Sequence, residues 1–209
     1  MDNGSTDERI WNKPQLLHRP IYLIETAQHR LSYAVNQGIA RAQSKYVVLF
    51  NNDAFAEPQW LAELLRTADA DPKIFAVQSL MIRHFERELA DDAGDYVTWM
   101  GFACKTGDGR RVSRYTKQKR IFSACGGAAL YRKSILDEIG GFDEHFFAYF
   151  EDVDLSCAPT MPATKMCSAP PPSATTSAVP APVLCATTPL KASRAAATAF
   201  CCHSKTSRC

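Results

Sequence analysis

The chain has 209 residues, of which 46% are hydrophobic and 22% are charged, and its formal net charge is +2. This length and composition are ordinary for a globular protein of one domain or one and a half. No stretch approaches the roughly 18 apolar residues of a membrane span, and the N-terminus lacks the basic-then-apolar pattern of a signal peptide, so we expect neither an integral membrane protein nor a conventionally secreted one.

The first 156 residues alternate between two apolar patterns. Runs of four or five apolar residues are typical of buried strands, whereas apolar residues three or four positions apart mark one face of a helix. In chain order these patterns predict a strand at 21–25, a helix at 31–42, a strand at 46–50, a helix from Pro58 to the Asp71-Pro72 pair, and a strand at 74–77.

The pattern continues after a more polar stretch. Residues 83–120 contain four glycines and predict loops and short strands. Strand-like runs at 121–125 and 128–131 flank a pair of glycines, and a short helix at 134–139 ends at a second pair. Strands that alternate with helices predict an α/β layer fold with a mostly parallel sheet.

The composition changes near residue 156. Segment 157–209 contains no Gly, Asp or Glu, yet it holds six of the eight Cys and eight of the 12 Pro. Its five basic side chains leave a mildly acidic body, so the net charge does not argue for nucleic acid as a partner. Because the tail has too few large apolar groups to offset the entropy of ordering, we expect it to be disordered.

Three explanations of this tail stay open. It is a linker or stalk, a Cys-rich metal or disulfide module, or the product of a shifted reading frame after Ser156. The scattered cysteines lack the paired spacing of a zinc site, and a nucleic-acid arm would need aromatic interleaving. The sharp junction and the excess of Ala, Pro, Thr and Cys favour the shifted frame, which an uninterrupted codon series in the DNA would contradict.

Two groups of acids in the body suggest chemistry. Asn51-Asn-Asp53 follows an apolar strand, where it forms either a simple Asx turn or an oxygen ligand for a divalent cation bound with substrate phosphates. Glu151, Asp152 and Asp154 lie among aromatic residues. They form either a solvated helix start or a set of carboxyl groups that raise one another's pKa and suit a general base.

Four segments, in their order, carry a family resemblance. They are DNGSTD at 2–7, NQGIA at 36–40, LFNNDA at 49–54 and GGFDEHFFAYFEDVDLS at 140–156, with CGGAALYR at 125–132 before the last. Together they closely resemble the family-2 inverting glycosyltransferases of the GT-A fold, particularly the rhamnosyltransferase-like branch. The resemblance covers nearly all of residues 1–156 and none of the tail, which implies a partial GT-A domain at 1–156.

The resemblance also implies roles for individual residues. It makes Asp152 the catalytic base and Asp53 the ligand of a Mg²⁺ or Mn²⁺ ion. It assigns nucleotide binding to Asp2, Asn3, Asn36 and Asn51. It assigns the acceptor or sugar side to Gly126, Gly127, Asp143, Glu144 and Glu151.

The implied reaction transfers a sugar from a nucleotide-sugar to an acceptor with inversion. The branch suggests a dTDP- or UDP-linked donor, with rhamnose as one candidate, and a saccharide or lipid-linked saccharide acceptor in cell-surface polysaccharide assembly. We accordingly expect a cytoplasmic protein without a transmembrane segment and without a nucleic-acid partner. Peripheral association with the inner face of the membrane is compatible with such an acceptor.

The sequence departs from the family at both ends. Family members have a strand, a helix and a second strand before the DNGSTD loop, and an Arg-containing helix and a His-bearing segment after the position of Ser156. Missing strands would leave a hydrophobic sheet edge unpaired. We therefore expect a poorly stable chain with little activity, and the alternative to an active enzyme is an inactive fragment that at most binds nucleotide.

Overall fold

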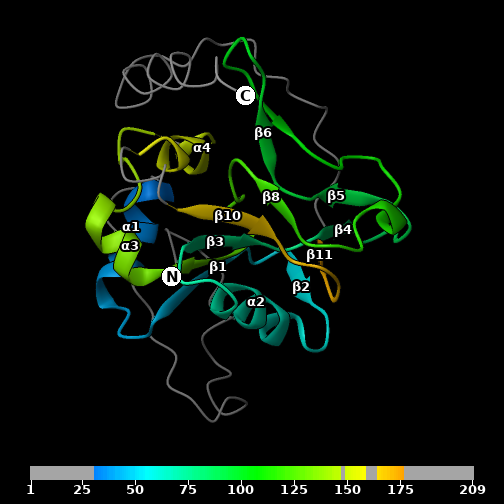
Figure 1. The fold of residues 1–209 in the computed structure, drawn as a ribbon, viewed down its shortest axis with the longest axis horizontal. Coiled ribbons are helices and arrows are strands. Elements are labelled where there is room, and N and C mark those ends of the chain that lie inside the picture. The colour runs from blue at the N-terminus through cyan, green and yellow to red at the C-terminus, as the bar shows by residue number, and fades with distance from the viewer. Residues whose placement is uncertain (1–30, 147–148, 159–163, 177–209) are drawn as a thin grey trace, which may run out of the picture.

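The computed structural model describes residues 31–146, 149–158 and 164–176 (Figure 1). Its helices are α1 (Leu31–Arg41), α2 (Trp60–Asp69), α3 (Lys133–Ile139) and α4 (Glu151–Ser156), and a 3₁₀ turn spans Val112–Arg114. Its strands are β1 (Tyr46–Phe50), β2 (Ala54–Ala56), β3 (Ile74–Gln78), β4 (Met81–Arg83), β5 (Ala90–Asp92), β6 (Asp95–Val97), β7 (Ala103–Lys105), β8 (Lys119–Ile121), β9 (Ala128–Arg132), β10 (Lys165–Ser168) and β11 (Ala174–Thr176).

The central sheet has five strands in the order β1-β9-β3-β10-β8. Strands β1 and β3 both pair antiparallel with β9, while β10 pairs parallel with β3 and antiparallel with β8. Consequently β1, β3 and β10 run in one direction, and β8 and β9 run in the other. The α/β class is confirmed. The described sheet is mixed rather than mostly parallel, because β9 lies between β1 and β3 and runs against both.

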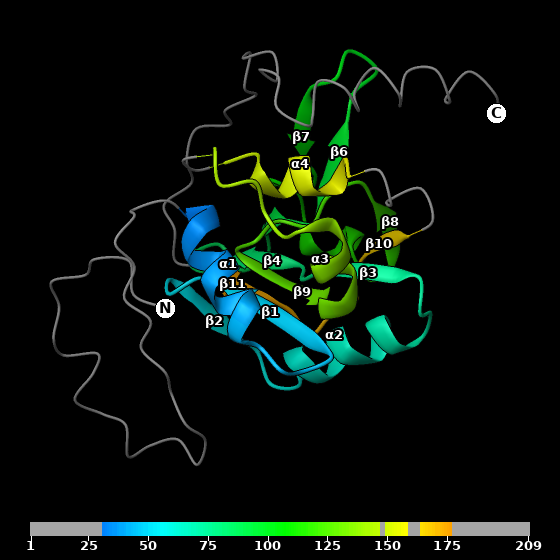
Figure 2. The same ribbon diagram turned by 90° about the vertical axis from the view of Figure 1, so that its left-hand side faces the viewer.

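Helices cover both faces of this sheet (Figure 2). Successive side chains of a strand point to opposite faces, and β9 follows this rule. Ala128 and Leu130 pack in one core with Leu64 of α2. Ala129 and Tyr131 pack in a second core, which also contains residues of α1, α3 and α4. The sheet therefore has an apolar core on each side, as in other layered α/β proteins.

The remaining strands form a smaller sheet and a hairpin. The smaller sheet has the order β2-β11-β4-β5, and the β6–β7 hairpin projects from the body (Figure 1). At the base of the hairpin the Asp95 N–H donates to the Ser123 carbonyl at 3.0 Å, and the Phe122 N–H donates to the Asp95 carbonyl at 2.9 Å. These bonds fix the position of Asp95 at the point where the hairpin leaves the body.

Part of the tail that we predicted to be disordered forms strands. Strand β10 lies inside the main sheet between β3 and β8, and β11 lies between β2 and β4. Met166 and Cys167 are 4% and 6% exposed and belong to the two different cores. The prediction of disorder is thus wrong for residues 165–168 and 174–176. The neighbouring strands β3 and β8 pair with β10, so Met166 and Cys167 can each enter the core on one face of the sheet.

Most of the other predicted elements are confirmed. The helices at 31–42 and 134–139 correspond to α1 and α3, and the strands at 46–50, 74–77 and 128–131 correspond to β1, β3 and β9.

Three details differ from the expectation. The second helix begins at Trp60 rather than at Pro58. The run at 121–125 is a strand only as far as Ile121, because the chain then turns to bridge the hairpin base. Strand β1 is an edge strand among the described residues and is only partly buried, whereas its apolar sequence predicted burial on both faces.

Some predictions fall outside the described residues. The predicted strand at 21–25 and the DNGSTD loop at 2–7, with Asp2 and Asn3, belong to this group. Among the helices that the structure describes, none has the length and apolar character required to cross a bilayer.

Candidate active site

Two adjacent glycines connect the end of β1 with the start of α4. The backbone N–H of Asn51 donates to the carbonyl of Gly127 at 2.9 Å, and the N–H of Gly126 donates to Oδ2 of Asp152 at 3.4 Å. Ligands of open α/β sheets bind beyond the carboxyl ends of strands, and Asn51 follows β1 directly. The turn therefore brings Asn51 and Asp152, which are distant in the sequence, to one place at such an end.

Gly127 keeps open a space that a side chain would fill. A Cβ atom at this position would lie 3.2 Å from Cε of Met81, 3.4 Å from Nδ2 of Asn51 and 3.6 Å from Sγ of Cys125. Neither Gly126 nor Gly127 has a positive φ. The requirement for glycine at position 127 is therefore one of space, and it lets the Asn51 amide lie beside the turn.

Asp53 lies in the turn between β1 and β2. The N–H of Ala54 donates to the Asn51 carbonyl at 3.2 Å and closes this turn. Asp53 is partly buried. Since one residue separates it from Asn51, Asp53 lies at the same end of β1 as the glycine turn.

Helix α4 begins from two residues with left-handed backbone. Tyr149 and Phe150 have φ values of 66° and 68°, a conformation that is uncommon for bulky side chains and costs on the order of 1–3 kcal/mol per residue. Such strain persists where the surrounding structure enforces it, often at functional sites. Here it precedes the first turn of α4, which carries Glu151 and Asp152.

Both carboxyl groups at the start of α4 titrate above their ordinary range. Burial, and secondarily the charge of Asp152, raises the pKa of Glu151 to about 7. Oε2 of Glu151 has no hydrogen-bond partner among the described residues. Burial also raises the pKa of Asp152, although the N–H groups of Val153 and Gly126 donate to its carboxylate and oppose the increase. A carboxylate of this kind is suited to accept a proton near neutral pH.

Two further carboxyl groups lie near enough to Asp152 to interact with its charge. Asp92 ends β5 and Asp95 begins β6, and Asp92 is 1% exposed and accepts the N–H of Gly94 at 2.7 Å. Burial raises the pKa of Asp92 to about 7 and that of Asp95 to about 8, and the charge of Asp152 adds to both increases. The Nζ atom of Lys105 lies 3.9 Å from Oδ2 of Asp92 and supplies a countercharge.

Asn36 holds the loop that precedes α4. Its Nδ2 donates to the carbonyl of Phe142 at 2.8 Å and to Oε1 of Glu144 at 3.0 Å, and its Oδ1 accepts the N–H of Phe142 at 2.9 Å. In the same loop Asp143 accepts the N–H of His145 at 2.9 Å. Asn36 of α1 is therefore hydrogen-bonded to the loop that contains Asp143 and Glu144. The roles of these three residues toward nucleotide and acceptor stay predictions.

Residues 1–140 match the profile described as Glycosyl transferase family 2. The chain belongs to this family. Among solved structures it is similar to GalNAc-T7 with UDP, GalNAc and Mn²⁺, with a TM-score of 0.58 and 15% identity over 73% of this chain and 31% of that chain. It is also similar to the mannosyltransferase PcManGT from Pyrobaculum calidifontis in complex with GDP-Man and Mn²⁺, with a TM-score of 0.49 and 18% identity over 74% of this chain and 38% of that chain.

The structural likeness to GalNAc-T7 shows the GT-A fold of the family. The chain spans about a third of the length of these two solved chains, 31% and 38% respectively. A search of curated proteins finds no match.

The donor atoms at the end of β1 fit the divalent cation that the family implies, provided that the substrate supplies further ligands. Asp53 offers a carboxylate and Asn51 an amide oxygen, and both are ligands that Mg²⁺ and Mn²⁺ accept. Among the described residues there is no group of three or more His, Cys, Asp or Glu able to hold a metal. Because Mg²⁺ is commonly held by one or two carboxylates together with substrate phosphates, this donor set fits a cation shared with a diphosphate.

The sequence reasoning missed several charged residues near the candidate site. It named Asp53 and Asp152 as candidates but not Asp92, Asp95 and Lys105, because the segment between β4 and β8 is polar and predicts only loops and short strands. A usable signal was present: three acids surround Gly94 in the run DDAGD at 91–95. Closely spaced acids between small residues are compatible with burial, whereas acids among other long polar side chains favour solvent.

We expect the free energy of unfolding to fall as pH rises from about 5 to 8. The pKa values of Asp92, Asp95 and Glu151 are raised to about 7, 8 and 7, so the folded state binds more protons than the unfolded state over this interval. The stability is then highest at the acidic end and declines through the folded-state pKa values, by about 2–4 kcal/mol for one fully buried carboxyl group.

Urea unfolding at several pH values measures this slope. Asp95→Asn is expected to flatten it, and Glu138→Gln on the exposed side of α3 is the matched control that leaves it unchanged. Stability that increases between pH 5 and 8, or a slope that is the same in Asp95→Asn, would contradict the assignment of buried carboxyl groups.

A pair of glycine substitutions tests the loop held by Asn36. A Cβ at Gly141 would lie 2.6 Å from Oδ1 of Asn36, whereas a Cβ at Gly140 would meet nothing within 4 Å, and both glycines have positive φ. Gly140→Ala is expected to cost about 1 kcal/mol of stability for the backbone alone. Gly141→Ala should cost about 1–2 kcal/mol more because it displaces Asn36. Equal urea midpoints for the two variants would exclude the Asn36 contact as a determinant of loop position.

Proposed function

We propose that this chain carries the catalytic core of a glycosyltransferase that moves a sugar from a nucleotide-sugar to a saccharide acceptor with inversion. Family membership supports the reaction class. The observation that carries the proposal is the position of Asp152, whose carboxylate accepts the Gly126 N–H at the carboxyl end of the sheet and whose pKa is raised by burial.

Asp152 acts as the general base in this proposal. Its carboxylate removes the proton of an acceptor hydroxyl while that oxygen attacks the anomeric carbon from the face opposite the diphosphate. One C–O bond forms, the bond from the anomeric carbon to the diphosphate oxygen breaks, and the nucleoside diphosphate leaves with the electron pair. A single displacement inverts the anomeric centre and needs no covalent intermediate, so no Ser or Cys nucleophile is required.

Burial raises the pKa of Asp152, and the charge of Lys105 opposes this increase. The charge of Asp152 in turn raises the pKa of Asp92 and of Asp95. The pKa of a general base is most effective when it lies near the working pH. Glu151, beside Asp152 on α4, is assigned to the acceptor side together with Gly126 and Gly127.

Asp53, with Asn51, would hold Mg²⁺ or Mn²⁺ together with the donor diphosphate. When bound, such a cation neutralises the charge that develops on the leaving phosphate. We assign Asp2, Asn3 and Asn36 to the nucleotide, as the resemblance implies, and we extend the proposal to a dTDP- or UDP-linked sugar. The acceptor is then a saccharide or lipid-linked saccharide of a cell-surface polysaccharide, reached at the cytoplasmic face of a membrane.

Release of nucleoside diphosphate tests the proposal. The chain is incubated with UDP-glucose or dTDP-rhamnose, a saccharide acceptor and Mn²⁺, and the released diphosphate is measured. We expect turnover that EDTA abolishes and that added Mn²⁺ or Mg²⁺ restores. Asp53→Asn should weaken metal binding because it removes the anionic ligand. The Mn²⁺ concentration needed for half-maximal rate should then rise at least ~10-fold.

Binding without turnover is the contrasting result. A chain that binds UDP or dTDP in a titration, but releases no diphosphate with any donor tested, matches an inactive fragment rather than an enzyme. Turnover that is unaffected by EDTA would contradict the assigned role of Asp53.

A further inference from the structure

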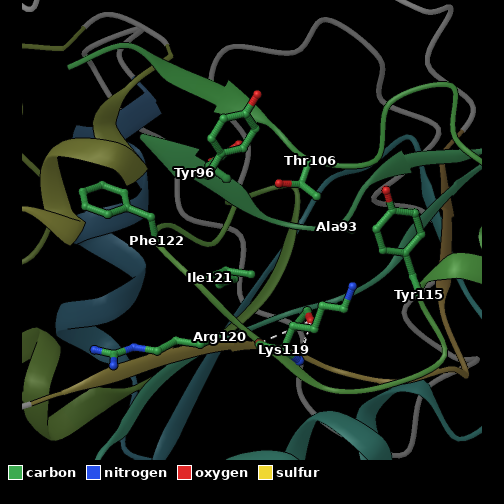
Figure 3. Close-up of a pocket in the computed structure, with 10 residues that line it drawn as sticks. Ala93, Tyr96, Thr106, Tyr115, Lys119, Arg120, Ile121 and Phe122 are labelled. Carbon is green, nitrogen blue, oxygen red and sulfur yellow. Dashed lines mark hydrogen bonds between the residues drawn. The ribbon is translucent and has the colours of Figure 1, made fainter. Parts of the chain in front are cut away.

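A cavity of about 160 Å³ lies between the base of the β6–β7 hairpin and β8 (Figure 3). It is smaller than the roughly 300–1,000 Å³ of sites for drug-sized ligands, so it suits one sugar unit or a comparably small group. The side chains used in the following argument are Asp95, Tyr96, Thr106, Tyr115, Lys119 and Ile121.

The cavity has aromatic walls and a rigid floor. In Figure 3 the rings of Tyr96 and Tyr115 stand on either side of the space above Ile121, and Thr106 lies between them. The Thr106 N–H donates to the Gly94 carbonyl at 2.8 Å. A Cβ on Gly94 would lie 2.7 Å from Cγ2 of Ile121, so the floor is closely packed. Aromatic walls with a few fixed polar groups are typical of small-molecule sites.

Lys119 supplies a positive charge at the edge of the cavity. Its Nζ lies 5.8 Å from the centre of the Tyr115 ring, within the range of a cation–π contact. The Oγ of Ser168 on β10 accepts the Lys119 N–H at 3.1 Å and fixes its backbone. The Arg120 side chain, next along β8, extends away from Tyr115 (Figure 3). Lys119 is thus the basic side chain in position to contact a ligand.

The segment that leads to the cavity is strongly basic. Residues 110–120 contain no acid, and their basic side chains are exposed and make no ion pair with any residue in the described part of the chain. Clustered charge of one sign attracts ligands of the opposite sign. These side chains are Arg110, Arg111, Arg114, Lys117, Lys119 and Arg120.

We propose that this cavity binds the acceptor, and that the acceptor is a saccharide carrying an anionic group such as a phosphate. The inference rests on the proposed glycosyltransferase function and names its acceptor class. The sugar ring packs against Tyr96 and Tyr115, the hydroxyl of Thr106 hydrogen-bonds to it, and the ammonium of Lys119 pairs with the anion. Asp95 lines the cavity and lies near enough to Asp152 to interact with its charge, so the ligand would lie on the side of the proposed base.

Titrations with simple probes test the proposal without requiring turnover. The probes are glucose 6-phosphate, glucose and inorganic phosphate, and binding is followed by isothermal titration calorimetry on the full chain. We expect glucose 6-phosphate to bind more tightly than either of the other two. Lys119→Met should weaken it ~10-fold while leaving glucose unchanged, and Tyr115→Ala should weaken both sugars at least ~5-fold. Lys117→Met, in the same basic segment but outside the cavity, is the matched control with a change below ~2-fold.

The outcomes separate this inference from the proposed function. Equal binding of glucose and glucose 6-phosphate, or equal effects of Lys119→Met and Lys117→Met, overturns the cavity assignment. A prenyl-linked glucosyl phosphate that binds with the same dependence on Lys119 and Tyr115 supports recognition of the sugar phosphate, whereas binding independent of both residues overturns it. If the enzyme turns over and Lys119→Met leaves the KM for a phosphorylated acceptor unchanged, the inference fails and the proposed function stands.

Discussion

Replacing Asp152 with asparagine is expected to reduce sugar transfer by at least ~10²–10⁴-fold, the range that positioned general bases contribute. The amide keeps the shape of the side chain and can still accept the Gly126 N–H, but it cannot take a proton at neutral pH. The loss should appear mainly in kcat, because the proton moves in the transition state. Diphosphate release is measured at saturating donor from pH 5 to 9. It gives the rate and shows whether the variant has lost the acidic limb of the pH–rate profile, which reports the titration of the general base.

Stability measurements separate a chemical from a structural effect of Asp152→Asn. Burial disfavours the ionised carboxylate, so the neutral amide should not lower the thermal midpoint at pH 8. Asp137→Asn, on the exposed side of α3 and ion-paired with Lys133 at 2.7 Å, is the matched control and should retain full activity. Retention of activity within threefold in Asp152→Asn would remove this residue from the mechanism, and a large fall in the midpoint would make the loss structural.

Replacing Met166 with aspartate is expected to unfold most of the described domain. Met166 is 4% exposed and packs in the core formed by Phe75, Tyr131 and Leu155. A carboxylate at this place would be buried without a countercharge, at a cost of about 4 kcal/mol or more. This cost is comparable with the total stability of many domains. Circular dichroism and urea unfolding at 25 °C measure the loss.

Two variants of the same strand serve as controls for this prediction. Met166→Leu conserves volume and should cost less than about 1.5 kcal/mol. Lys165→Met removes a half-exposed ion pair with Asp71, whose Nζ–Oδ2 distance is 2.6 Å, and should cost no more than about 1 kcal/mol. A Met166→Asp protein as stable as these two would mean that β10 does not occupy an interior position of the sheet.

The sequence pattern predicted the framework well where the signal was local. The apolar period of α1, the buried run of β3 and the glycines that close α3 each depend on neighbouring residues. The chain near Gly140 shows why: its φ of 86° and the 3.0 Å bond from its N–H to the Leu136 carbonyl follow from the choice of glycine itself. Such features can be interpreted without knowledge of the tertiary structure.

The features that sequence reasoning missed depend on tertiary contacts. Strand β10 has only a few residues, and Met166 and Cys167 form a strand because β3 and β8 leave a place between them. Likewise, the acids Asp92 and Asp95 become part of the site because the hairpin base folds against residues 122 and 123. Composition averaged over a segment cannot show which few side chains will meet a partner from far along the chain.

The position of β10 between β3 and β8 has a consequence for biosynthesis. Ile74 pairs with Lys165, and Phe55 pairs with Thr175, 120 positions further along the chain. Such distant pairings give the fold a high contact order, and proteins whose stabilising contacts close long loops fold more slowly. As the chain leaves the ribosome, one edge of β3 stays unpaired until residue 168 has emerged. A nascent chain in this interval offers a binding edge to chaperones, so its yield should depend on how quickly translation completes the last strands.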